Sequence, residues 1–315
     1  MKKIFSLAFV CLLVAGSLTG CGEKTAEKKE NGKISIVSTV FPTYDFAKQI
    51  CSDKAEVTQL LPPGSESHTY EPTPQDIITI QNCDLFIYVG GESDTWVDDI
   101  LSSMATPVKT IKMMDCVTIV EEQVIEGMEA EEEEHEEAEP EYDEHVWTSP
   151  KNAVKITQAI TDAVCALDAD NKEAYQANSA AYQAKLKTLD KSFSDFFATV
   201  ANKLIVVGDR FPLRYFADSY GIKYYAAFPG CSCQTDPSAT TIAFLIDKVK
   251  TEKVSTVFYM EFSNHLVADS IAEATGIKTA VLYAGHNVTA ADLTGGVTYI
   301  SLMEKNLAAL KEAMK

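Results

Sequence analysis

The sequence lacks a second long apolar run and has few basic residues. Beyond residue 20, no stretch of the 315-residue chain is apolar for long enough to span a bilayer, so we expect the remaining body to be soluble. The chain has 27 lysines and arginines against 46 aspartates and glutamates, and its formal net charge is −19. Because no basic stripe is present, nucleic acid is excluded as a partner.

Cysteines are also few. Two of the eight, Cys11 and Cys21, lie in the N-terminal segment. The other six are Cys51, Cys83, Cys116, Cys165, Cys231 and Cys233. Their scatter is not typical of a small scaffold built on disulfides. One or two disulfides remain open, and the spacing does not indicate which cysteines would pair.

The N-terminus has the features of an export signal. A positive start is followed by an apolar run from Ile4 to Ala15 and by Leu18-Thr19-Gly20-Cys21. This ending resembles a bacterial lipoprotein box, which implies that residues 1–20 are removed and that lipid is attached to Cys21. Residues 21–32 are rich in Lys, Glu and Gly and are predicted to be a flexible tether. The protein is therefore expected outside the cytoplasm, anchored to the membrane lipid through Cys21.

Short apolar runs typical of strands alternate with stretches that have helical spacing. The predicted strands are Ile34 to Thr39, Val57 to Leu61, Leu85 to Val89, Leu204 to Val207, Lys223 to Ala226, Val254 to Tyr259 and Thr279 to Tyr283. The predicted helices between them are Pro42 to Ile50, Pro74 to Gln81, Ile242 to Lys250 and Leu266 to Ala274. This alternation predicts an α/β fold of two lobes with largely parallel sheets.

Residues 150–200 are predicted to form a long, rigid helical connector between the lobes. Pro150 suits a first helical turn, Ser149 can cap it, and one interruption is expected near Asp168. A connector of this kind would limit the lobes to a slight rocking motion. The predicted organisation is an N-terminal lobe over 33–149, the connector over 150–200, and a C-terminal lobe over 201–315.

The segment from Glu121 to Glu144 contains 14 acidic side chains and no basic ones. Such a low-complexity sequence cannot bury a core, so we predict a disordered acidic loop within the N-terminal lobe. Carboxylates attract dications over long distances and bind hard cations loosely. The segment is therefore either a collector of metal ions or a solvated insertion without a binding role.

Two of the five histidines stand in loops that are crowded with oxygen ligands. His68 lies in Gly64-Ser65-Glu66-Ser67-His68-Thr69-Tyr70-Glu71-Pro72, and His145 lies in Asp143-Glu144-His145-Val146-Trp147. Imidazole is the commonest protein ligand for zinc and its first-row neighbours. Metal binding is therefore the first hypothesis, and ordinary surface histidines are the alternative.

Four possible ligands lie just past the carboxyl ends of predicted strands: His68, Asp209, Glu261 and His286. Parallel sheets bind ligands at the carboxyl ends of their strands. Two facing lobes would therefore bring these side chains to one cleft between the lobes, where His145 joins them. Polar residues also follow strands simply because loops are polar, and this is the better interpretation of Asp209 or Glu261 alone. The three histidines together favour a metal site.

Over its length after Cys21, the chain resembles the metal-binding receptor lipoproteins of bacterial zinc and manganese ABC transporters. The resemblance rests on the lipobox and on the segments Gly64 to Asp76 and Asp143 to Pro150. It implies that His68 and His145 are the ligands from the N-terminal lobe. It also implies a third ligand just after the Leu204 to Val207 strand, a carboxylate ligand near the end of the last strand, and an ABC permease as partner.

The sequence departs from the family pattern at both ligand positions of the C-terminal lobe. Where the family usually has histidine or glutamate, Asp209 is the only plausible ligand, and His286 stands where an aspartate is usual. We expect a redistributed site of His68, His145, His286 and Asp209, a ligand set that suits zinc. Two alternatives remain for the uncertain position. Cys231 could supply a thiolate, and Glu261 either orients an imidazole or, as a further carboxylate ligand, would favour manganese.

The predicted function is that of an extracytoplasmic receptor that binds a divalent metal, zinc before manganese, and delivers it to an ABC permease. An enzyme is not expected, because the sequence has no His-Glu-x-x-His stretch that would combine metal ligands with a general base. A metal-containing surface adhesin is the alternative, since members of the resembled family have been described in that role.

Overall fold

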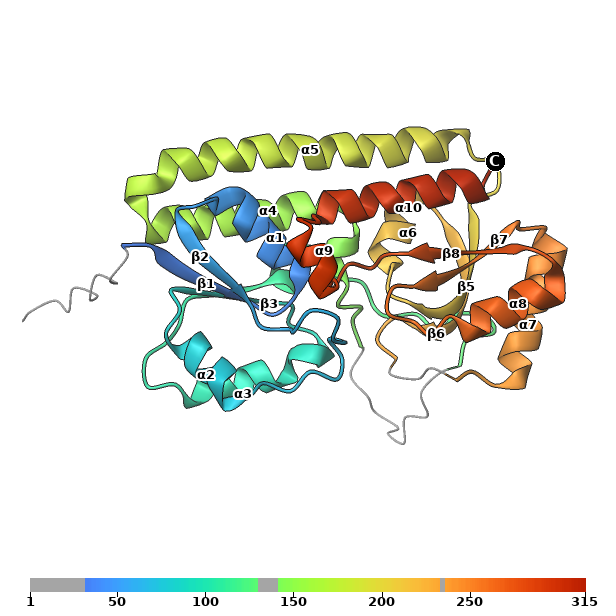
Figure 1. Ribbon diagram of the computed structural model, residues 1–315, viewed down its shortest axis with the longest axis horizontal. Helices are drawn as coiled ribbons and strands as arrows, with labels where there is room; N and C mark the ends of the chain where they lie inside the picture. Colours follow the sequence, from blue (N-terminus) through green and yellow to red (C-terminus); the bar gives the residue numbers. More distant parts are fainter. Residues whose placement is uncertain (1–31, 130–140, 233–235) are drawn as a thin grey trace, which may run out of the picture. The chain divides into compact units, whose positions relative to one another are not determined.

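Two four-stranded parallel sheets organise the computed structural model, which describes residues 32–129, 141–232 and 236–315 (Figure 1). Residues Ile34–Lys315 form one compact unit. The first sheet has the strand order β2-β1-β3-β4, with β1 Ile34–Ser38, β2 Ala55–Gln59, β3 Leu85–Tyr88 and β4 Thr110–Lys112. The second has the order β6-β5-β7-β8, with β5 Leu204–Phe211, β6 Lys223–Pro229, β7 Thr256–Met260 and β8 Lys278–Leu282. The predicted α/β class with parallel sheets is confirmed.

In each sheet the second strand along the chain pairs on one side of the first strand, β1 or β5, and the next strand pairs on its other side. The strand order therefore reverses beside β1 and β5. Parallel sheets bind ligands at such a position, beyond the carboxyl ends of the strands. In the second sheet β5 is longer than predicted. It runs on to Phe211, and its register with β6 shifts between Val207 and Arg210. Asp209, which was expected in the loop after this strand, therefore lies within it.

The helices around the first sheet are α1 Phe41–Cys51, α2 Pro74–Gln81 and α3 Thr95–Ser103. Those around the second are α6 Arg214–Tyr220, α7 Ala239–Glu252, α8 Leu266–Thr275 and α10 Tyr299–Ala313. The short helix α9 Ala290–Thr294 lies beside α1, where its Leu293 packs against the cluster that contains Phe41 (Figure 1). The bounds of α2 agree with prediction because Thr73 and Asp76 form a reciprocal capping box at its start. Helices α3, α6, α9 and α10 and the short strand β4 were not predicted.

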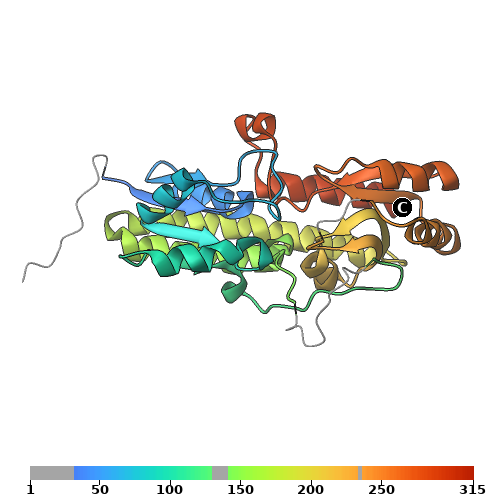
Figure 2. The same ribbon diagram turned by 90° about the horizontal axis from the view of Figure 1, so that it is seen from below.

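The predicted connector is a pair of packed helices, α4 Pro150–Leu167 and α5 Lys172–Thr199, joined by a short turn over Ala169–Asn171. The expected interruption near Asp168 is therefore confirmed. The 28 residues of α5 span about 42 Å at the helical rise, and α10 packs beside it (Figures 1 and 2). Ser149 occupies the N-cap position of α4 as predicted, but its hydroxyl makes no capping hydrogen bond and pairs with the Ser219 hydroxyl at 2.8 Å instead.

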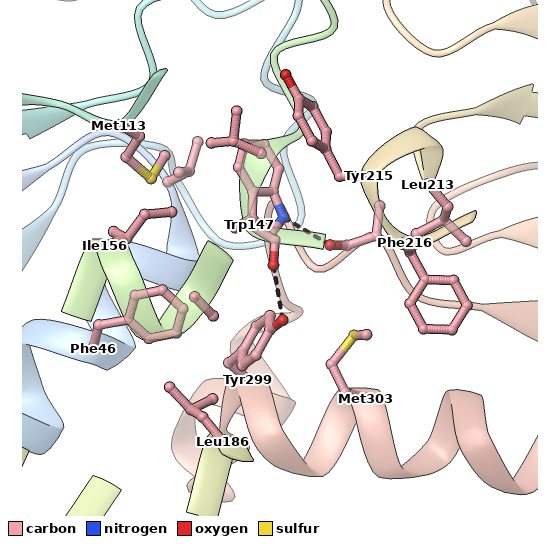
Figure 3. Close-up of a cluster of buried hydrophobic side chains, with 14 of the residues drawn as sticks. Phe46, Met113, Trp147, Ile156, Leu186, Leu213, Tyr215, Phe216, Tyr299 and Met303 are labelled. Carbon is pink, nitrogen blue, oxygen red and sulfur yellow. Dashed lines mark hydrogen bonds between the residues drawn. The ribbon is translucent and has the colours of Figure 1, made fainter. Parts of the chain in front are cut away.

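One buried cluster contains apolar residues of both sheets, from Ile36 and Ile87 to Ile205 and Val207. Trp147, which follows His145 closely, is 1% exposed and lies at the centre of the close-up in Figure 3. Its indole N–H donates to the Ala284 carbonyl at 2.8 Å, and the Tyr299 hydroxyl donates to the Trp147 carbonyl at 2.8 Å. The turn that carries His145 is thus fastened to the segment that follows β8.

Several sequence predictions fall outside the described residues. These are the signal peptide over 1–20, the lipid site at Cys21, and the tether over 21–32 except Gly32. The described part of the chain contains no helix whose length and apolar character would suit a membrane span. None of the described cysteines, Cys51, Cys83, Cys116, Cys165 and Cys231, forms a disulfide, and Cys233 is not described. The lobe boundaries at 33–149 and 201–315 stay predictions.

The flanks of the acidic segment hold defined positions, so the expectation of disorder is wrong for residues 121–129 and 141–144. Glu121 pairs with Tyr142 in an isolated antiparallel bridge. The Glu129 carboxylate accepts hydrogen bonds from the Ser238 backbone N–H at 2.6 Å and from the Thr241 hydroxyl at 3.1 Å, at the start of α7. Packing against the C-terminal lobe supplies the contacts that the segment itself lacks. Residues 130–140 lie outside the described part.

Candidate metal centre

His68 and His145 lie side by side although 77 residues separate them in the sequence. His68 belongs to the loop between β2 and α2, and His145 precedes the short helical turn Val146–Thr148 that leads into α4. Their ring centroids are 5.4 Å apart. Both side chains are nearly inaccessible to solvent, at 5% and 2% exposure. The interpretation of these residues as ordinary surface histidines is therefore wrong.

His286 comes from the other sheet, in the turn after β8. Gly285 precedes it at a φ of 74°, a left-handed conformation that glycine adopts without strain. Its neighbour Asn287 donates from its side-chain amide to the carbonyls of Pro62 and Ser65, at 2.7 and 2.8 Å. These bonds fasten the His286 turn to the loop that carries His68. Residues from both sheets therefore meet at one place.

Each of the three imidazoles has a carboxylate beside its Nδ1 atom. The distances are 3.5 Å from His68 to Glu144, 3.2 Å from His145 to Asp143, and 3.7 Å from His286 to Glu261. A carboxylate in this position fixes the ring and favours the tautomer that leaves Nε2 free to bind a metal. The buried Nε2 of His286 has no hydrogen-bond partner among the described residues, as expected for an atom reserved for a metal ligand bond.

Glu66 supplies an oxygen at the same place. Its Oε1 atom lies 3.5 Å from the free Nε2 of His286, and its Oε2 atom forms an ion pair with the Arg210 guanidinium. Burial would raise the pKa of Glu66, but His286 and Arg210 together lower it to about 2, so the carboxylate is ionised at neutral pH. Sequence reasoning did not single out Glu66 or Arg210. The sequence did offer one signal for Glu66, because this carboxylate stands two positions before His68 in the same loop.

Asp209 is bound elsewhere. Its carboxylate accepts hydrogen bonds from the backbone N–H of Arg210 at 2.8 Å and of Met260 at 3.2 Å, and it thereby links β5 to β7. No hydrogen bond or ion pair joins it to His68, His145 or His286 within the described ranges. The structure thus brings His68 and His145 together and places His286 beside Glu66 of the same loop, whereas the Asp209 carboxylate is engaged with backbone amides. The role of Asp209 as a ligand stays a prediction.

Cys231, the alternative ligand, belongs to a different group. Its sulfur and the carboxylates of Glu122 and Glu141 offer ligand atoms within 4.8 Å of one another, whereas His68, Glu144 and His145 form a separate group of this kind. Burial raises the pKa of the Cys231 thiol, and the Glu144 and Glu122 carboxylates raise it further. The thiol is therefore protonated at neutral pH in the metal-free protein, and a metal would have to displace this proton in order to bind there.

Comparison with known proteins identifies the family. A family model described as zinc-uptake complex component A, periplasmic, matches residues 36–313. The chain belongs to this zinc-uptake family. The family consists of components of an uptake complex and is not an enzyme family.

Two relatives and two solved structures resemble this family member over most of its length. The chain is 36% identical over 318 residues to the zinc-binding lipoprotein AdcA of Streptococcus pneumoniae, covering 99% of this chain but only 61% of AdcA. It is also 36% identical over 324 residues to the high-affinity zinc uptake system protein ZnuA of Bacillus subtilis, covering 99% of that protein. The Zn(II)-bound ZnuA-like domain of Streptococcus pneumoniae AdcA superimposes with a TM-score of 0.74, at 34% identity, covering 90% of this chain and 99% of that domain. The metal-dependent lipoprotein YcdH of Bacillus subtilis gives 0.76 at 33% identity, with the same coverage.

In this member of the zinc-uptake family, two of the three imidazoles are held neutral. Burial lowers the pKa of His68 to about 4 and that of His286 to about 3, because both rings lose hydration and the Arg210 charge acts in the same direction. Burial alone would also lower the pKa of His145, but the adjacent Asp143 carboxylate raises it above the ordinary value. Burial raises the pKa of Glu261 to about 7.

We expect zinc binding at pH 5.5 to release about two protons, one from His145 and one from Glu261, rather than one from each of the three histidines. His68 and His286 are already neutral at this pH, whereas His145 and Glu261 are protonated and lose their protons as the metal binds. Affinity should therefore fall as the pH drops through the pKa values of His145 and Glu261, by about tenfold per pH unit for each proton released. Calorimetry in buffers of different ionisation enthalpy counts these protons. Glu261→Gln should reduce the count to about one, and a count of three would contradict the depressed pKa values.

Proposed function

We propose that this protein is an extracytoplasmic receptor that binds zinc through His68, His145, His286 and Glu66 and delivers it to an ABC permease. The observation that supports this proposal most strongly is the set of three imidazoles from two sheets, each with a carboxylate near Nδ1, together with the buried Nε2 of His286, which has no hydrogen-bond partner among the described residues. Three imidazole nitrogens and one carboxylate oxygen close a tetrahedral site of the type that zinc prefers. Glu66 takes the oxygen position that the sequence suggested for Asp209.

The family and its relatives support the choice of metal and partner. The relatives of Streptococcus pneumoniae and Bacillus subtilis are named as zinc-binding and zinc-uptake proteins. The chain spans less than two thirds of AdcA, so the activity of that longer protein is carried over here only for the shared part. We further propose that the protein is anchored to the membrane through lipid on Cys21 and that it has no catalytic activity.

The zinc assignment predicts the outcome of a direct competition. When zinc and manganese are supplied together at equal concentration, we expect the purified mature protein to retain one equivalent of zinc after desalting and almost no manganese. A site dominated by imidazole favours the metal later in the first-row series. Elemental analysis of the same sample gives both metals. Preferential retention of manganese would instead show that a further carboxylate enters the coordination sphere and would refute the proposed zinc ligand set.

A further inference from the structure

Arg210 places a permanent positive charge at the proposed zinc site. It lies near the end of β5, and its guanidinium extends to the loop after β2, where it forms the ion pair with Glu66 Oε2. A second guanidinium nitrogen donates to the Ser232 carbonyl at 3.5 Å. The Arg210 side chain is 16% exposed. A guanidinium in a protein does not lose its proton, so this charge is present at every relevant pH.

The same carboxylate faces both the guanidinium and the free imidazole nitrogen. Glu66 Oε2 contacts Arg210, while Glu66 Oε1 lies 3.5 Å from His286 Nε2. The Glu66 carboxylate thus joins the guanidinium to the His286 nitrogen, which places a unit positive charge next to the proposed site. A positive charge at this distance disfavours a dication beside it.

We propose that Arg210 is an internal cation that competes with the metal for Glu66 and thereby sets how tightly this receptor holds its cargo. In the metal-free protein the guanidinium neutralises Glu66. When the metal binds, it takes the carboxylate from Arg210 and must also overcome the repulsion of the guanidinium. Arg210 therefore weakens zinc binding and speeds zinc release, which a delivery protein needs. This inference rests on the proposed function.

The test compares variants that remove or keep the charge. Arg210→Gln should bind zinc about tenfold or more tightly than the wild type, because a neighbouring unit charge changes an ionisation equilibrium by a factor of about 10 to 1000. Zinc transfer to a fluorescent chelator should slow in proportion. Arg210→Lys keeps the charge, so its zinc affinity should stay within about threefold of the wild-type affinity. A difference of that size is smaller than the effect of losing a charge interaction. Weaker or unchanged binding by Arg210→Gln would overturn the proposal and make Arg210 a positioning residue for Glu66.

A double-mutant cycle isolates the competition for Glu66. If Arg210 acts by holding this carboxylate, Arg210→Gln should increase affinity less in a Glu66→Gln background than in the wild type. Equal gains in the two backgrounds would show that Arg210 does not act through Glu66 and would overturn the competition. If wild-type protein binds no zinc at all, the proposed function fails. If it binds zinc and His68→Ala weakens that binding by about 100-fold or more, failure of the Arg210 variants concerns this inference alone.

A measurement on the unmodified protein keeps the proposal testable if Arg210→Gln does not fold. The chain contains only two arginines, Arg210 and Arg214, and Arg214 pairs with Asp218 at 2.9 Å. Protein labelled with ¹⁵N-arginine should therefore give two side-chain Nε signals. Saturation with zinc should shift the Arg210 signal as its ion pair with Glu66 breaks, while the Arg214 signal serves as the internal control. An Arg210 signal that zinc leaves unchanged would contradict the proposal.

Discussion

Replacing His68 or His145 with alanine should lower zinc affinity by about 100-fold or more. Structural zinc sites with four ligands bind with about 10–16 kcal/mol, so one ligand accounts for about 3 kcal/mol, or about two powers of ten in the dissociation constant. His286→Ala should have a similar effect, because its free Nε2 faces Glu66. Competition against a zinc chelator of known affinity measures each loss.

The matched control for these variants is His265→Ala. His265 is a half-exposed histidine that pairs with Asp269 at 2.8 Å on the surface of α8, so its loss should leave zinc affinity unchanged. Circular dichroism of each metal-free variant should match that of the wild type, which separates loss of a ligand from loss of the fold. Wild-type affinity in His286→Ala would refute a site shared between the two sheets.

The same titrations distinguish Glu66 from Asp209. Glu66→Gln should weaken zinc binding strongly, since it removes the charged oxygen beside His286. Asp209→Asn should change zinc affinity little, because its carboxylate serves the backbone of Arg210 and Met260. The reverse pattern would restore Asp209 as the oxygen ligand.

Replacing Trp147 with alanine should reduce the free energy of unfolding by about 3–5 kcal/mol, the usual cost of removing a buried aromatic side chain. Trp147 is 1% exposed within the cluster of Figure 3, and its indole N–H bonds to the Ala284 carbonyl. Urea denaturation followed by circular dichroism measures the loss. Fluorescence is unsuitable because only Trp96 would remain.

Two further variants test why Trp147→Ala should reduce the free energy of unfolding. Trp147→Phe keeps an aromatic ring but removes the N–H, so it should cost less than Trp147→Ala. Trp96→Ala should also cost less, because Trp96 is only half buried at the edge of a smaller cluster. Equal losses for Trp96→Ala and Trp147→Ala would show that Trp147 does not have the central role that its burial indicates.

The fold was largely readable from the sequence because it depends on local patterns. Apolar runs such as Leu85 to Tyr88 are typical of buried strands, and the Thr73-Pro74 start of α2 carries its own cap. The elements that were missed are those whose pattern is short or mixed. Strand β4 has only three residues, too few for a periodic signal.

For the proposed metal site, the sequence by itself pointed to His68 and His145, because each stands in a distinctive motif, and it placed His286 after a strand that could be recognised. Only the tertiary structure decided the oxygen ligand that we propose. Glu66 meets His286 across about 220 residues of chain, and Arg210 joins them from a strand whose bulged end also turns Asp209 onto the backbone of Met260. The spacing of residues along the sequence does not predict these contacts, because contacts between distant segments depend on how the two sheets are arranged in the fold.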